Sequence, residues 1–237
     1  MRIFLIAAAM LTFPFVFDVV QESPVYAEIV QDGAIYRDKM LRFEVARVSQ
    51  GDIVEIWEDF SEKIYRVDTG DAQGWINARH LKIPEDVSTD MSVASSNQLE
   101  AFANEKSFES KTKHLLMVDI ARQKLYIFEG KIGAWVLVNS FDCSTGTNTS
   151  PTTRGSFSLK DRGEWFYSYR LESGAKYWIR FNGHYLFHSI PMDKHKNILK
   201  GEDVVGIRRS NGCVRLLIED MRWIYENISD GAAVVIL

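Results

Sequence analysis

The chain has 237 residues, of which 46% are hydrophobic and 25% are charged, the balance of a globular protein with enough apolar material for a core. Its 28 Lys and Arg against 32 Asp and Glu give a formal charge of −4, so bulk charge gives no reason to expect binding to nucleic acid or to an anionic membrane. Two cysteines, Cys143 and Cys213, are too few for a disulfide framework or a thiolate zinc site.

Residues 1–27 are typical of an export signal. The uncharged apolar run at 3–17 is shorter than the roughly 20 residues that a membrane-spanning helix needs, and it has the length of a signal-peptide core. Val25 and Ala27 are the small side chains that a signal peptidase reads, which predicts cleavage before Glu28. An uncleaved anchor is the alternative. We expect a secreted protein of the cell wall or periplasm, with no stable membrane insertion after cleavage.

Residues 28–83 carry short strand patterns between turn signals. Turn signals stand at 32–33, 50–52 and 69–71, and short apolar runs follow at 54–57, 64–67 and 74–76, a spacing typical of a small β-barrel. The order of these runs resembles the bacterial SH3-like domain, whose members attached to exported enzymes often bind cell-wall glycan or peptide. The alternative is that the barrel binds no ligand and only separates the catalytic domain from the rest of the chain.

Residues 84–113 are expected to be a linker. Serines and Asn97 make the stretch at 88–97 polar and flexible, and the apolar spacing at 98–108 predicts a short amphipathic helix. Nothing in this segment suggests chemistry.

Residues 114–237 carry stronger strand patterns. Apolar runs between 115 and 141 are joined by tight turns and predict three strands. Apolar residues at 217–228 share one helix face, and 232–237 predicts a final buried strand. The chain is therefore predicted to be mainly β, with a small barrel followed by a β-rich domain with one or two helices.

The residues that suggest chemistry are His188 and the turn at 210–213. Gly212 lets the backbone turn tightly before Cys213, so the sulfur can be presented and its own N–H can point at a developing oxyanion. A cysteine becomes a good nucleophile when a histidine takes its proton, and His188 is the candidate base. On this pattern alone, a buried structural cysteine is the alternative.

These segments resemble the catalytic domain of the L,D-transpeptidases, exported enzymes that cross-link peptidoglycan through a cysteine. The family has a His-bearing strand and then Ser-His-Gly-Cys, which this sequence matches with 187–189 and 210–215. An earlier family block, Ser-Thr-Gly followed by Thr-Pro-Thr, a Gly and a Phe, is matched at 144–146 and 150–157. The resemblance covers about half of the chain.

The resemblance implies that Cys213 is the nucleophile and His188 the general base, with main-chain N–H groups near Gly212 as the oxyanion hole. Asn211 stands where the family has a second histidine. An amide donates and accepts hydrogen bonds but does not transfer a proton, so Asn211 and Ser210 are expected to orient the site.

The resemblance also implies a substrate cleft. It places Tyr185 and Ser189 beside the base, and Arg215 near the substrate carboxylate, a role that suits a guanidinium fork. The long gap between base and nucleophile predicts a large loop over the cleft at 191–205. His184 precedes the base by four residues, but a strand would not bring the two together as a metal pair. No metal and no cofactor is implied.

The implied reaction is acyl transfer on a stem tetrapeptide of peptidoglycan. The cysteine attacks the carbonyl before the terminal D-Ala, which leaves, and an amine of a neighbouring stem resolves the thioester. If water resolves it, the enzyme is an L,D-carboxypeptidase. A third hypothesis is a wall-binding protein with a decayed catalytic domain, for which Asn211 is the hint. The expected partners are stem peptides and the cell wall.

Cys143 is a rival nucleophile because His184 and His188 follow it in the chain. Against it, no glycine precedes Cys143, so no tight turn would expose its thiol. We expect a small buried thiol rather than a redox partner for Cys213.

Overall fold

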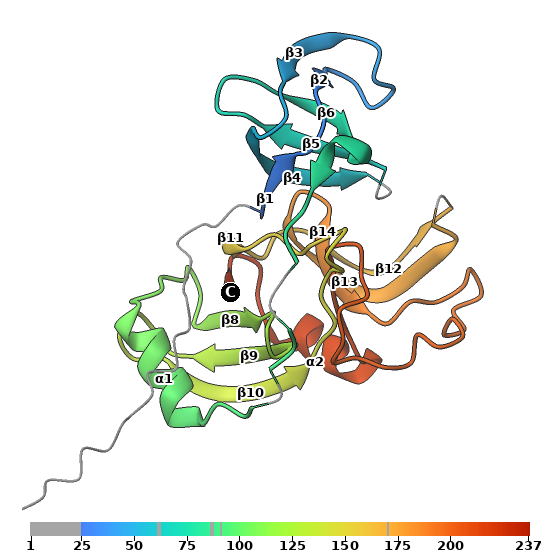
Figure 1. Cartoon of the computed structure of the whole chain (residues 1–237). Coiled ribbons are helices and arrows are strands. Elements are labelled where there is room, and N and C mark those ends of the chain that lie inside the picture. Colours follow the sequence, from blue (N-terminus) through green and yellow to red (C-terminus); the bar gives the residue numbers. More distant parts are fainter. Residues whose placement is uncertain (1–24, 61–62, 86–87, 91, 170) are drawn as a thin grey trace, which may run out of the picture.

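A computed structural model describes residues 25–60, 63–85, 88–90, 92–169 and 171–237. Within these residues, strands form three sheets accompanied by two α-helices (Figure 1). The expectation of a mainly β chain with one or two helices is confirmed. None of the helices in the described part is long and apolar enough to span a membrane. The expected export signal lies almost entirely outside the described residues.

The first sheet is antiparallel and has its own core, which includes Ile29, Ile35, Val67 and Ile76. Alternating residues of each strand point inward, as the period of two requires. Its strands lie in the order β3-β2-β6-β5-β4-β1-β7, and a short 3-10 helix precedes the last. Their bounds are β1 Val25–Ile29, β2 Gly33–Tyr36, β3 Glu44–Val48, β4 Ile53–Phe60, β5 Ile64–Asp68, β6 Gln73–Asn77 and β7 Leu81–Lys82.

Strand β1 contains the residues that were expected to end the export signal. Tyr26 pairs with Glu55 of β4, and Ala27 is 1% exposed in the core of the sheet. Cleavage before Glu28 would remove three of the five residues of β1. Within the described residues, the first sheet therefore already includes residues 25–27, which the sequence assigned to the export signal.

Part of the segment 84–113 packs into the C-terminal half and does not behave as a linker. Helix α1, Ser96–Glu105, begins after Ser95, whose hydroxyl accepts the first-turn hydrogen bond of a capping box. Asn104 donates to the Trp135 carbonyl at 3.0 Å and accepts from its main-chain N–H at 2.6 Å. These bonds and the two buried residues of α1 attach the helix to the second half of the chain.

The C-terminal half contains two further sheets with the main core between them. One sheet has the order β10-β9-β8-β16-β11 and the other the order β12-β13-β14-β15. Helix α2, Ile218–Asn227, packs against β13 and β14. The strand bounds are β8 His114–Asp119, β9 Lys124–Glu129, β10 Val136–Asp142, β11 Gly155–Ser158, β12 Arg162–Ser168, β13 Ser173–Asn182, β14 Tyr185–Ser189, β15 Val214–Leu216 and β16 Ala233–Ile236.

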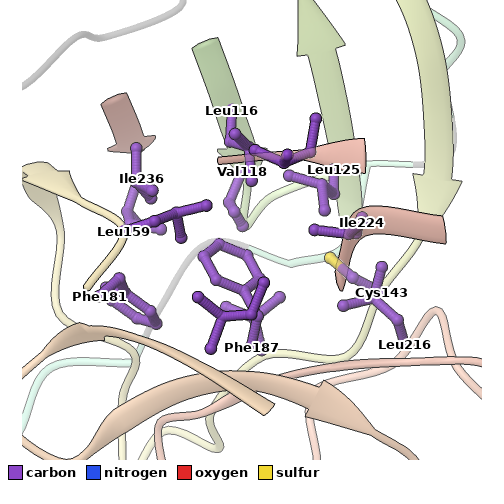
Figure 2. Packing of buried hydrophobic residues seen from close by; sticks show 14 of the residues in the cluster. Leu116, Val118, Leu125, Cys143, Leu159, Phe181, Phe187, Leu216, Ile224 and Ile236 are labelled. Atoms are coloured by element: carbon purple, nitrogen blue, oxygen red, sulfur yellow. The ribbon is translucent and has the colours of Figure 1, made fainter. Parts of the chain in front are cut away.

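The main core fixes the position of β14 and β15, which carry the candidate site. Phe187 of β14 and Leu216 of β15 point into a cluster that also includes Leu116, Leu125 and Ile236 of the other sheet (Figure 2). β14 and β15 are parallel neighbours, with His188 opposite Arg215. Because side chains alternate along a strand, the faces opposite this core are directed away from it and toward a cavity.

Candidate active site

The turn at 210–213 presents Cys213 at the beginning of β15. Gly212 has φ of +90°, a conformation that is strained for any residue with a side chain. A Cβ atom at this position would also overlap the ring of Tyr185, which packs directly on the turn. Ser210 closes the turn, because its hydroxyl donates to the Cys213 carbonyl at 2.5 Å. Glycine is therefore required here on two grounds, and the bond of Ser210 is compatible with the orienting role that the resemblance implies.

The Gly212–Cys213 peptide is held so that its N–H is available. The Thr152 hydroxyl donates to the Gly212 carbonyl at 2.9 Å and accepts from the Gly146 N–H at the same distance. In a planar trans peptide, the carbonyl and the following N–H point in opposite directions, so the Cys213 N–H points away from Thr152. In the described part of the chain, no main-chain carbonyl accepts from this N–H. It can therefore donate to an oxyanion that forms beside the sulfur.

The Cys213 thiol is half-buried next to the beginning of β14. The Leu186 N–H donates to Sγ at 3.4 Å, and the thiol donates to the His184 carbonyl at 3.7 Å. Burial raises the pKa of the Cys213 thiol, while the Leu186 N–H and the charge of Arg215 act in the opposite direction. The resting side chain is therefore a thiol, which needs a base when it attacks.

His188 has the geometry of that base. Its Nδ1 lies 2.6 Å from the Ser189 carbonyl, and because a carbonyl only accepts, Nδ1 carries the proton and Nε2 keeps its lone pair. Burial, helped by the charge of Arg215, lowers the pKa of His188 to about 3. The ring of Phe166 packs edge-on against the imidazole, with ring centroids 5.7 Å apart. The imidazole is therefore neutral and fixed in orientation at neutral pH.

Nucleophile and base line one cavity of about 450 Å³. Tyr185, Asn211 and Arg215 line it too, as the sequence suggested. Within the residues that the structure describes, no hydrogen bond joins Sγ to His188, and the thiol donates to the His184 carbonyl instead. Catalytic hydrogen bonds are often made only when substrate is bound, and a rotation about the Cys213 χ1 bond would redirect the thiol.

Ser189 does not line the cavity, so its expected role in substrate binding is wrong. Its side chain is fully buried on the core side of β14. The hydroxyl accepts from the Lys176 N–H at 2.9 Å and donates to the Ile190 carbonyl at 3.2 Å. Ser189 instead holds β14 in place and supplies the carbonyl that orients His188.

Arg215 is held by the segment 191–205, for which the sequence predicted a loop over the cleft. Glu202 of this segment accepts from Arg215 at 2.9 Å, and Pro191 lines the cavity. Burial lowers the pKa of Arg215, and the charge of Glu202 raises it. The guanidinium keeps a buried Nε without a hydrogen-bond partner among the described residues. Arg215 thus lines the cavity as a cation that is bonded to Glu202.

Residues 144–146 hold the turn at 210–213 in place through hydrogen bonds. The Thr145 carbonyl accepts from the N–H groups of Arg209 and Ser210 at 2.9 and 3.0 Å. The buried Gln123 side chain in turn bonds the Thr145 hydroxyl at 2.7 Å and accepts from its N–H at 2.9 Å. The motif at 144–146, to which the sequence analysis assigned no role, therefore fixes the position of the turn at 210–213.

Cys143 is a core residue. It is 0% exposed, and Figure 2 shows its sulfur directed into the apolar cluster beside Ile224. Burial raises the pKa of its thiol far above the ordinary range. Both cysteines are free, so the expectation of a small buried thiol is confirmed.

No group of three or more His, Cys, Asp or Glu side chains in the described ranges is arranged to hold a metal ion. His184, which the sequence raised as one half of a metal pair, instead bonds Glu58 of the first sheet at 3.0 Å.

Comparison with known proteins agrees with this geometry. The family model of the YkuD L,D-transpeptidase catalytic domain matches residues 113–236. The chain belongs to this family. A Bacillus subtilis (strain 168) protein named as a candidate L,D-transpeptidase, YciB, is 39% identical over 131 residues, which are 53% of this chain and 67% of that protein. The family resemblance drawn from the motifs is confirmed. The residues that the family model matches, 113–236, do not include the first sheet.

Two solved structures are similar to this chain. A fused Zn-dependent amidase/peptidase/peptidoglycan-binding domain-containing protein from Clostridium acetobutylicum ATCC 824 is 25% identical with a TM-score of 0.51, covering 69% of this chain and 76% of its own. An L,D-transpeptidase from Stackebrandtia nassauensis is 21% identical with a TM-score of 0.45, covering 61% of this chain and 67% of its own. Membership of the L,D-transpeptidase family implies a cysteine-dependent acyltransferase that acts on peptidoglycan.

Sequence reasoning missed three residues that contact or line the candidate site. Thr152 lies in a matched motif, but its bonds to Gly146 and Gly212 required the fold. Glu202 belongs to no recognisable motif and lies in the segment 191–205, which was expected only to be a loop. Lys39 lies in the loop that joins β2 and β3 of the first sheet and still lines the cavity, for which no local signal exists.

Proposed function

We propose that this chain is an exported L,D-transpeptidase that cross-links or remodels peptidoglycan by cysteine acyl transfer on stem tetrapeptides, with release of D-Ala. One observation carries the proposal. Cys213, with a main-chain N–H available beside its sulfur, and His188, with Nε2 unprotonated, line the same cavity. A thiol, a neutral base and an oxyanion donor are the groups that acyl transfer needs.

In the first step, Sγ attacks the carbonyl carbon of the bond to the terminal D-Ala as the thiol proton passes to His188 Nε2. The carbonyl oxygen becomes an oxyanion that accepts from the Cys213 N–H. The imidazolium, whose Nδ1–H stays on the Ser189 carbonyl, then gives its proton to the leaving nitrogen. The C–N bond breaks, D-Ala leaves with a neutral amine, and a thioester remains on Cys213.

In the second step, an amine of a neighbouring stem attacks the thioester while His188 takes its proton. The C–S bond breaks, the sulfur recovers the proton from the imidazolium, and a new amide forms. Arg215, which lines the cavity beside His188, would pair with a carboxylate of the donor peptide. Water in place of the amine gives an L,D-carboxypeptidase on the same substrate.

We also propose that the first sheet is the SH3-like domain that the strand order at 28–83 suggested, and that residues upstream of β1 direct export. Seven antiparallel strands around a separate core support the first part. The apolar run at 3–17 supports the second.

The proposal is tested by intact-mass spectrometry of the purified protein with a stem tetrapeptide. We expect an adduct of the tetrapeptide minus D-Ala, which is consumed when a diamino-acid amine is added. Conversion to a linked dimer identifies a transpeptidase, and conversion to free tripeptide alone identifies a carboxypeptidase. An absence of any adduct from pH 6 to 9 would favour a wall-binding protein with a decayed catalytic domain.

A further inference from the structure

The first sheet forms one wall of the catalytic cavity. Lys39, from the loop between β2 and β3, and Asp59 and Phe60, from the end of β4, line the cavity together with Cys213 and His188. Figure 1 shows the sheet lying against the end of the C-terminal half where β14 begins. A unit that only tethered or spaced the catalytic half would have no reason to contribute to this wall.

Specific polar contacts hold the two halves together at this wall. The Ser150 hydroxyl donates to Asp59 Oδ2 at 2.5 Å, and the Tyr65 hydroxyl donates to the Thr149 carbonyl. His184 Nε2 lies 3.0 Å from Glu58 Oε1. Because the His184 carbonyl is also the acceptor of the Cys213 thiol, the first sheet is connected to the nucleophile through one residue.

Lys39 is fixed by its neighbours and yet accessible. Its Nζ lies 4.4 Å from the ring centre of Phe60 and 4.5 Å from that of Trp75, and it donates to Glu58 at 2.8 Å. The side chain remains 39% exposed. An ammonium group has three donors, and cation–π contacts with two rings hold it in place without using them. Lys39 can therefore donate to a ligand in the cavity while bonded to Glu58.

Lys39 is the cation of the lining that is best placed to meet a ligand. Three cations line the cavity, and each has a carboxylate partner: Lys39 with Glu58, Arg180 with Asp161, and Arg215 with Glu202. Glu58 is shared between Lys39 and His184, whereas Asp161 and Glu202 lie against arginines. A substrate carboxylate that enters the cavity can therefore pair with Lys39, whose own partner is divided between two groups.

We propose that the first sheet completes the substrate site, and that Lys39 binds a carboxylate of the peptide substrate and discriminates against the corresponding carboxamide. This inference rests on the proposed function, which supplies a peptide with several carboxylates. It assigns Lys39 a part in substrate specificity that is separate from the chemistry at Cys213. It also contradicts the idea that the first sheet acts only as a spacer.

The test measures binding alone, with the full chain carrying Cys213→Ala so that no turnover occurs. Calorimetry gives Kd for a tetrapeptide with all carboxylates free and for peptides in which each carboxylate is converted singly to a carboxamide. With Lys39 present, we expect one of these conversions to weaken binding about fivefold, the scale of a partly exposed charge pair. With Lys39→Met, the same conversion should change Kd by less than about twofold.

Control variants distinguish the loss of the Lys39 charge from a loss of folding. Lys82→Met removes an exposed lysine of the same sheet outside the cavity and should leave the fivefold discrimination intact. Lys39→Arg should retain it, and Lys39→Gln replaces Lys39→Met if the latter lowers Tm. Unchanged discrimination in Lys39→Met, or no peptide binding to the Cys213→Ala chain, would overturn the inference. A failure of the proposed function is detected in a different experiment, because the chain that retains Cys213 would then form no acyl adduct.

Discussion

Cys143 and Cys213 belong to the same half of the molecule, and their surroundings give the two thiols different chemistry. Cys143 follows the end of β10 inside the main core, where burial, reinforced by the charges of Asp119 and Asp142, raises the pKa of its thiol. Cys213 precedes β15 at a cavity, where the Leu186 N–H and the charges of Arg215 and Arg180 oppose the effect of burial on its pKa. The backbone around a cysteine and the cavity it faces, rather than the residue type, decide whether it can react.

The largest expected difference between the two cysteines is in their accessibility. In the folded protein, a small alkylating reagent should modify Cys213 at least about 1,000 times faster than Cys143, because the core must open before Cys143 can react. Peptide mass spectrometry after timed alkylation measures both rates. After denaturation the two rates should become similar, and equal rates in the folded protein would mean that Cys143 is not in a closed core.

Removal of the candidate base tests whether the reactivity of Cys213 depends on His188. His188→Ala should slow acylation by about 10²–10⁴-fold, the range for the loss of a general base. His195→Ala is the matched control, because His195 is an exposed histidine that does not line the cavity. Stopped-flow measurement of acylation by tetrapeptide gives both values. Near-normal acylation by His188→Ala would remove His188 from the mechanism.

The buried imidazole also predicts an acid-dependent loss of stability. Folding lowers the pKa of His188 from about 6.5 to about 3, so between these values the unfolded chain binds a proton that the folded chain does not. The free energy of unfolding that depends on His188 is therefore fully present above pH 6.5 and falls as the pH is lowered. At pH 4 the loss should be about 3 kcal/mol relative to pH 7.

Urea unfolding of the wild type and of His188→Gln at pH 7 and pH 4 isolates this contribution, because all other titrating groups are shared. We expect the difference in free energy of unfolding between the two proteins to change by about 3 kcal/mol between these pH values. A difference that does not depend on pH would show that the imidazole is not held neutral by burial.

The smallest effect is expected at Thr152, which holds the peptide between Gly212 and Cys213. Thr152→Val keeps the shape of the side chain but removes its bonds to Gly146 and Gly212, and we expect acylation to slow about tenfold, together with a loss of about 1–2 kcal/mol of stability. Thr147→Val, which loses one bond between exposed hydroxyls, is the control. Equal rates for the two variants would mean that Thr152 does not set the direction of the Cys213 N–H.

The candidate nucleophile and the candidate base, which the structure brings to one cavity, could be picked out from the sequence because their signals are local. Gly212 before Cys213 and the strand that carries His188 are each recognisable within a few residues. The position of Ser189 could not be decided from strand alternation alone, because Tyr185 lies on the same side of the alternation as Ser189 and still lines the cavity.

The contribution of the first sheet could not be predicted from local patterns. Lys39 and Phe60 reach the cavity only because the two halves pack against each other, a contact between segments more than a hundred residues apart. The same holds for Glu202, whose bond to Arg215 depends on the course of the segment 191–205. Part of the expected linker at 84–113 was misread because its packing partners lie in the strands that follow it.

The central claim is that Cys213, and not Cys143, is the nucleophile. The most direct measurement is formation of the tetrapeptide acyl adduct by Cys213→Ala and by Cys143→Ala, followed by intact-mass spectrometry under identical conditions. We predict no adduct on Cys213→Ala, and on Cys143→Ala at least about a tenth of the wild-type rate, a loss of no more than about 1.4 kcal/mol in the barrier. An adduct on Cys213→Ala that disappears in Cys143→Ala would contradict the account.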